Sequence, residues 1–87
     1  MLISKNRFKL LKIFYSHPEK DYYMQEISGL LGKKAGVYQR ALNDLEKEGI
    51  LLSEYKANAR FFKINKDCAI YNELKGIIYK SNPRKEN

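Results

Sequence analysis

The sequence is poor in cysteine, in histidine and in long apolar runs. Its single cysteine, Cys68, excludes an internal disulfide, and no apolar stretch is long enough to span a bilayer or to act as a secretory signal. These absences predict a cytoplasmic protein without a membrane partner. Because 87 residues make one domain with a thin core, no room is expected for an enclosed substrate cavity, and an enzyme is not expected.

Residues that support metal or nucleophilic chemistry are equally scarce. His17, Cys68 and the scattered carboxylates lack the spacing that assembles a tetrahedral metal site. No glycine-rich phosphate loop, nucleophile elbow or Cys/His pair is present. We assign no role to Cys68, since a lone cysteine most often packs as a small hydrophobe, and we interpret His17 as a partner of a helix C-terminus. The sequence therefore predicts no catalysis, no metal and no cofactor.

Acidic residues are in the minority. The chain has 17 Lys and Arg residues against 10 Asp and Glu, a formal net charge of +7. This excess is typical of proteins that bind polyanions, and nucleic acid is the leading class of partner. A basic surface that serves only solubility is the alternative, because net charge alone does not identify a ligand. The location of the charges must decide between the two.

Apolar periodicity and turn residues divide the chain into short elements. Four helices are predicted, over residues 5–16, 24–31, 36–48 and 68–80. Three strands are predicted, over residues 22–24, 50–56 and 60–64, the last two forming a hairpin. Ser4 is a typical N-cap for the first helix, while Gly32 and Gly49 stand where the second and third helices must end. Asn58, in the hairpin turn, tolerates a left-handed backbone.

The second and third predicted helices, joined by a glycine-containing turn, form a helix-turn-helix unit. The second helix of such a unit can lie in the major groove of DNA. With Tyr38, Leu42 and Leu45 buried, a helical projection places a polar set on or beside the opposite face: Gly36, Gln39, Arg40, Asn43 and Lys47. Arginine can bind guanine through two hydrogen bonds, and asparagine or glutamine can bind adenine in the same way. A solvated helix face is the alternative interpretation of this set.

Lys33 and Lys34 stand before the third helix, where cations oppose the helix dipole at a cost of a few tenths to about 1 kcal/mol. A DNA phosphate docked there would offset that cost, since it would bind the lysines and the free backbone N–H groups together. Because lysines are unfavourable before a helix N-terminus, their presence beside a candidate binding site favours a functional interpretation.

The order helix, strand, helix, helix, strand, strand, helix resembles the winged helix-turn-helix family, and its ArsR-like regulators in particular, over residues 4–80. Four segments carry the resemblance, namely 23–32, 37–42, 45–51 and 60–65. It implies a mainly helical fold with a small β-hairpin wing, no enzymatic activity, and a third helix that enters the major groove of double-stranded DNA. The wing would contact the backbone or minor groove through Lys56, Asn58 and Arg60. Lys33 and Lys34 depart from the family pattern, and so do Ala57 and Ala59, which suggests a weak wing contact.

Metal-sensing ArsR-like repressors carry cysteines in the second or third helix, and here those helices contain none. The sequence thus predicts a repressor without a thiolate metal switch. The rival hypothesis is a winged-helix adaptor that binds protein or RNA, for example to recruit a nucleotidyltransferase.

Apolar residues on the first and last helices exceed what an isolated amphipathic helix needs. A homodimer is therefore predicted through Phe8, Leu11, Tyr15, Ile70, Leu74, Ile77 and Ile78. The alternative is that the last helix packs on the first within one chain. Residues 1–82 are expected to form the domain, and 83–87 a disordered polar tail.

Overall fold

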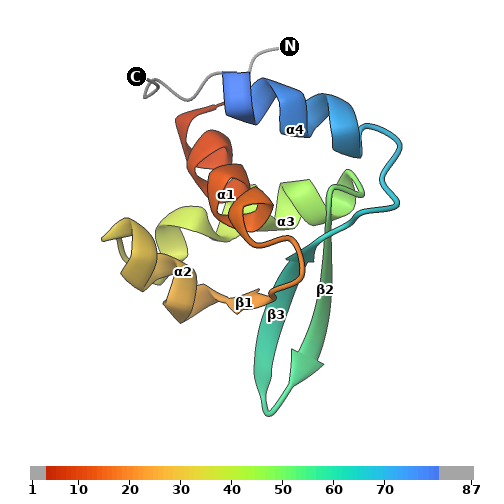
Figure 1. The fold of residues 1–87 in the computed structure, drawn as a ribbon. Coiled ribbons are helices and arrows are strands. Elements are labelled where there is room, and N and C mark those ends of the chain that lie inside the picture. Colours follow the sequence, from red (N-terminus) through yellow and green to blue (C-terminus); the bar gives the residue numbers. More distant parts are fainter. Residues whose placement is uncertain (1–3, 81–87) are drawn as a thin grey trace.

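The structure, a computed structural model, describes residues 4–80. Its elements follow the order α1 (Lys5–Ser16), β1 (Tyr22–Tyr23), α2 (Met24–Leu31), η1 (Ala35–Tyr38), α3 (Gln39–Lys47), β2 (Leu51–Lys56), β3 (Ala59–Ile64) and α4 (Tyr71–Lys80), where η1 is a 3₁₀ helix. The predicted fold class, mainly helical with a small hairpin, is confirmed (Figure 1). The predicted tail, 83–87, lies outside the described residues.

Helix ends follow from capping residues in the sequence. The Ser4 hydroxyl accepts a hydrogen bond from the Arg7 N–H at 3.2 Å, which caps α1. Gly32 ends α2 with φ at 72°, and Gly49 follows α3 with φ at 81°. Both values lie in the left-handed region that glycine adopts at little steric cost. These two glycines fix the directions in which the chain leaves α2 and α3.

The strands form one antiparallel sheet in the order β1-β3-β2. Tyr22 pairs with Phe62 across β1 and β3, and the hairpin register runs from Leu51 opposite Ile64 to Lys56 opposite Ala59. Both central residues of the hairpin turn, Ala57 and Asn58, have positive φ, at 50° and 65°. Such paired left-handed residues match the right-handed twist of a two-residue hairpin. The hairpin extends from the helices at the end opposite α4 (Figure 1).

The core is centred on α1, which contributes four buried side chains, Leu10, Leu11, Phe14 and Tyr15. Residues from α3, the sheet and α4 pack into the same cluster. The Tyr15 hydroxyl donates a hydrogen bond to the Tyr71 carbonyl oxygen at 3.0 Å, so α4 is tied to α1 by a polar contact as well as by apolar packing. Among residues 4–80, no helix has the length and apolar character needed to cross a bilayer.

The last helix differs from its predicted bounds. It begins at Tyr71 rather than Cys68, because the intervening backbone forms turns: the Cys68 N–H donates to the Asn65 carbonyl, and the Tyr71 N–H donates to the Cys68 carbonyl. The Asn65 side chain also accepts a hydrogen bond from the Asp67 N–H at 3.0 Å, a local bond that competes with helix formation.

Four of the seven side chains predicted for a dimer interface are buried within the chain itself: Leu11, Tyr15, Leu74 and Ile78. The reason is that α4 packs on α1 in the same chain, which was the alternative arrangement. Phe8 is half-buried, and Ile70 and Ile77 remain exposed at 38% and 37%. Of the seven predicted interface residues, these three could face a second copy.

Candidate nucleic-acid interface

Helix α3 separates an apolar face from a polar one. Tyr38, which precedes it, and Leu42 and Leu45 within it are at most 1% exposed. The predicted polar set is exposed: Gly36, Gln39, Arg40, Asn43 and Lys47. The helical projection therefore assigns these residues to the correct faces. The Arg40 side chain projects into solvent, at 95% exposure.

The turn before η1 carries two exposed lysines, Lys33 and Lys34. The turn is held tightly, because the Gly32 N–H donates to the Ser28 carbonyl at 2.8 Å and the Ser28 hydroxyl donates to the Lys33 carbonyl. Neither lysine forms an ion pair within residues 4–80. No acidic residue occupies the first turn of η1 or of α3, so both positive charges stay uncompensated there.

The region 39–48 also contains acidic residues, which would repel a polyanion. Each of them is paired with a basic residue: Asp44 with Arg40 at 3.9 Å, Glu46 with Arg60, and Glu48 with Arg7. Three different elements, α3 itself, β3 and α1, supply the cations. The pairing offsets the negative charge of α3 and leaves Lys33, Lys34 and Lys47 as uncompensated cations near its polar face.

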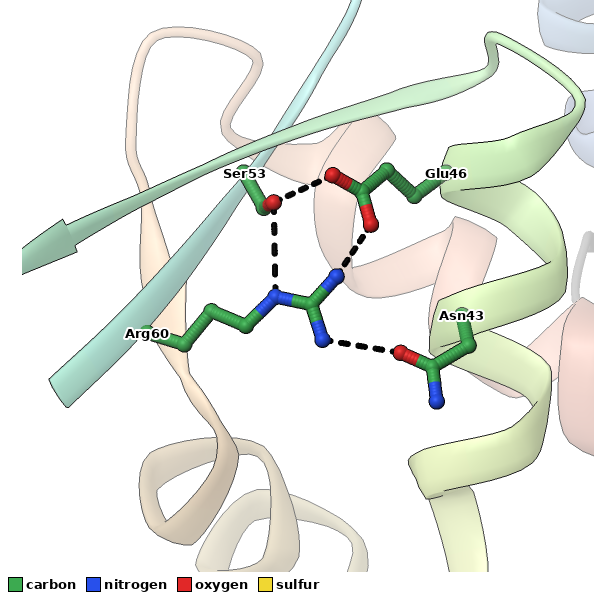
Figure 2. Close-up of polar contacts among 4 residues, drawn as sticks. All are labelled: Asn43, Glu46, Ser53 and Arg60. Atoms are coloured by element: carbon green, nitrogen blue, oxygen red, sulfur yellow. Dashed lines mark hydrogen bonds and ion pairs between the residues drawn. The ribbon is translucent and has the colours of Figure 1, made fainter.

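Arg60 does not project from the wing as a free side chain, and the phosphate contact expected of it stays a prediction. Its guanidinium turns toward α3 and donates to the Ser53 hydroxyl at 3.3 Å, to the Asn43 carbonyl oxygen at 2.9 Å and to Glu46 (Figure 2). The Ser53 hydroxyl donates in turn to the second oxygen of Glu46. The guanidinium also stacks 4.7 Å from the ring centre of Phe62. Arg60 therefore links β2, β3 and α3.

Lys56 is also tethered within the chain. Its ammonium donates to the Asp21 carboxylate and lies 4.7 Å from the ring centre of Phe61. The hydrogen bond raises the pKa of Lys56 and lowers the pKa of Asp21. Of the three predicted wing contacts, only Asn58 stands exposed at the tip without a partner within residues 4–80.

A scan against protein-family models finds no match, and neither does a search of curated proteins. Solved structures do match. MepR, a transcription regulator of the Staphylococcus aureus multidrug efflux pump MepA, has a TM-score of 0.72 and 14% identity over 90% of this chain and 59% of its own. The MepR–DNA complex gives 0.71 and 15% identity, over 90% of this chain and 65% of that one. A possible transcriptional regulator from Methanosarcina mazei Go1 gives 0.67 and 20% identity, over 90% and 66%.

This chain has the winged helix-turn-helix fold. It spans less than two thirds of the length of each of these three structures. The finer resemblance to ArsR-like regulators stays a prediction.

Within the winged helix, α2, η1 and α3 form the helix-turn-helix and β2–β3 forms the wing. The structure brings the predicted turn and helix residues to one region, while it draws Lys56 and Arg60 into intramolecular contacts. Sequence analysis missed Glu46 as a partner of Arg60, because no spacing rule connects α3 to the hairpin. It missed Ser53 because the turn type, and with it the hairpin register, could not be read. The Arg40–Asp44 pair, by contrast, has a helical i, i+4 spacing that can be read from sequence. Among residues 4–80, no cluster of His, Cys, Asp and Glu is suited to hold a metal ion.

Proposed function

We propose that the protein is a transcription regulator that binds double-stranded DNA in a sequence-specific manner, with α3 in the major groove. The observation that carries the proposal is the surface around α3, whose polar side chains are exposed, whose acids are paired and whose preceding turn holds two uncompensated lysines. The fold supports it, since MepR, which has the same fold, has been solved in complex with DNA. None of the contacts described above favours the adaptor alternative.

The residues fall into two groups by the contact they are suited to make. Arg40 and Gln39 are exposed on a rigid helix, which suits hydrogen bonds to base edges in the major groove. Lys33, Lys34 and Lys47 are exposed cations on or beside the same helix, which suits phosphate contacts that position the protein without reading sequence. Asn58 at the wing tip would reach the neighbouring backbone or minor groove.

The regulator would act as a homodimer. Ile70 and Ile77 stay exposed after α4 has packed on α1, and Phe8 is only half-buried, so an apolar surface remains for a second copy. Two copies would present two α3 helices to half-sites about one helical turn of DNA apart. Occupation of such an operator would repress transcription, and binding to chromosomal DNA would place the protein in the cytoplasm.

The proposal is tested by selecting bound sequences from a random duplex library and measuring their affinity by fluorescence anisotropy. If a dimer neutralises about 6 to 10 phosphates, affinity should fall by about 10³ to 10⁵ between 50 and 200 mM salt. Lys34→Glu should weaken binding to all duplexes and lower the salt dependence. Lys80→Glu makes the same charge change on α4, at the end opposite the wing, and should leave binding near the wild-type level (Figure 1).

Two results would contradict the proposal. One is a wild-type protein that binds no duplex at 50 mM salt. The other is a Lys34→Glu variant whose DNA affinity equals that of Lys80→Glu, because the turn would then make no phosphate contact.

A further inference from the structure

The contacts of Arg60 assign it a task beyond the proposed contact surface. We propose that Arg60 is a positioning residue that determines which base Asn43 reads, because it holds the Asn43 side chain in one orientation and fixes the wing against α3. This inference rests on the proposed function, since base reading presupposes DNA binding. It replaces the expectation that Arg60 contacts phosphate and that Asn43 reads adenine.

The orientation of Asn43 follows from the chemistry of its partner. A guanidinium has five N–H donors and no acceptor, so the Asn43 atom that faces it at 2.9 Å must be the carbonyl oxygen. The amide nitrogen of Asn43 consequently points away from Arg60 (Figure 2). Its two N–H groups are free to donate to a ligand.

This orientation changes which base edge Asn43 can recognise. Adenine is read by an amide that accepts from N6 and donates to N7. The Asn43 oxygen has two lone pairs, of which the bond from Arg60 takes one. The guanidinium also polarises the amide, which weakens its oxygen as an acceptor from N6 and strengthens its N–H groups as donors. With its oxygen engaged by Arg60, Asn43 presents donors, which suit edges that only accept, such as O6 and N7 of guanine or O4 of thymine. Arg60 thus shifts the preference of Asn43 from adenine toward guanine or thymine.

The network is built to hold this state. Glu46 compensates the charge of Arg60, and Ser53 joins the two, so that three elements meet at one guanidinium. The side chains of Arg60 and Glu46 are only 26% and 34% exposed, which restricts competition from water. Phe62 lies at 4.7 Å from the guanidinium and limits its movement on the other side. A cation fixed and compensated in this way has little charge left to attract a phosphate.

The experiment compares wild-type protein with Arg60→Lys, which keeps the charge. Ser53, Asn43 and Glu46 each bind a different nitrogen of the planar guanidinium, and a single ammonium nitrogen cannot reach all three. The first measurement is the NMR signal of the Asn43 side-chain NH₂ in protein without DNA. It should report an ordered amide in the wild type and a mobile one in Arg60→Lys. Arg7→Lys is the matched control, because Arg7 also pairs with an acid of this region, Glu48, and does not touch Asn43.

The second measurement is competition binding with the four bases at the position whose preference disappears in Asn43→Ala. In Arg60→Lys, adenine should gain roughly tenfold over guanine and thymine, the lower part of the range for one bidentate contact. The salt dependence should stay at the wild-type value, and Arg7→Lys should keep the wild-type base preference. In the double variant Asn43→Ala/Arg60→Lys the base preference should equal that of Asn43→Ala alone, since Arg60 acts through Asn43.

The outcomes separate this inference from the proposed function. A wild type that binds no duplex refutes both. In the other case the wild type binds DNA, and Arg60→Lys lowers the slope of log affinity against log salt by about 1 without changing the base preference. Arg60 would then be a phosphate contact, which refutes this inference alone. If Arg60→Lys does not fold, Glu46→Gln replaces it: loss of the ion pair should loosen the Asn43 amide signal, and an unchanged signal overturns the proposal.

Discussion

Replacing Leu74 by alanine tests whether α4 belongs to the core of a single chain. Leu74 is 2% exposed and packs, together with Ile78, in the cluster that contains Leu11 and Tyr15 of α1. If this packing is intramolecular, the substitution creates a cavity in the monomer. Its cost is then independent of protein concentration.

The magnitude follows from the burial. Truncating a fully buried leucine costs about 2 to 5 kcal/mol, since the lost transfer energy adds to that of the cavity. An 87-residue domain has a total stability of roughly 4 to 13 kcal/mol at about 0.05 to 0.15 kcal/mol per residue, so this one change removes a large share of it. A loss of about 3 kcal/mol corresponds to a fall in Tm of about 12 to 24 °C for a domain of this size.

The assay is thermal and urea denaturation followed by circular dichroism, at several protein concentrations spanning two orders of magnitude. Ile77→Ala is the matched control, because Ile77 lies on the same helix but is 37% exposed, and it should cost less than about 1 kcal/mol at low concentration. A Leu74→Ala cost below about 1 kcal/mol, or one that varies with concentration, would show that α4 packs against a second copy instead.

Two further predictions concern pH and assembly. Burial of its hydroxyl, with smaller contributions from Tyr71 and Cys68, raises the pKa of Tyr15, so the folded state retains this proton above pH 10, where the unfolded state releases it. This contribution to the free energy of unfolding is therefore complete below pH 10 and decreases above it. Urea denaturation between pH 8 and pH 11 should show that the free energy of unfolding declines less steeply for Tyr15→Phe than for the wild type. Equal slopes would exclude Tyr15 as the cause. Sedimentation at tens of micromolar should give a homodimer that Ile77→Lys converts to a monomer, whereas a monomeric wild type would remove the dimer from the proposed function.

Local signals account for most of the fold that the sequence predicts. The bounds of α1 and α2 were predictable because Ser4 and Gly32 act within one helical turn of the positions they cap. The start of α4 was predicted too early, because Ile70 stands at helical spacing from Leu74. The backbone before Tyr71 nevertheless forms turns, which Asn65 stabilises. Apolar periodicity identifies residues that share a face of a helix. It does not show at which residue the helical backbone begins.

Apolar spacing also leaves open what covers a face. The apolar residues of the last helix could pack against a partner chain as well as against α1. Leu74 and Ile78 belong to the core because the chain folds back and places α4 against α1. The wing cations posed the same difficulty. Whether Lys56 meets a phosphate or Asp21 depends on two registers, that of β1 with β3 and that of β3 with β2, because Lys56 lies on β2.

The pairing of basic residues with acidic ones differs between the wing and the turn before η1, and this difference bears on which residues would determine DNA specificity. In the wing, Lys56 and Arg60 are held by Asp21 and Glu46, while the turn before η1 keeps Lys33 and Lys34 without an ion pair within residues 4–80. Under the proposed function, the attraction to phosphate would be concentrated at the turn and along α3, and the wing would serve as a support for that helix. Because Arg60 joins the wing to Asn43, we expect that a change in the wing that makes no DNA contact would still alter which base is read. The contact surface is then smaller than the set of residues that determines its specificity.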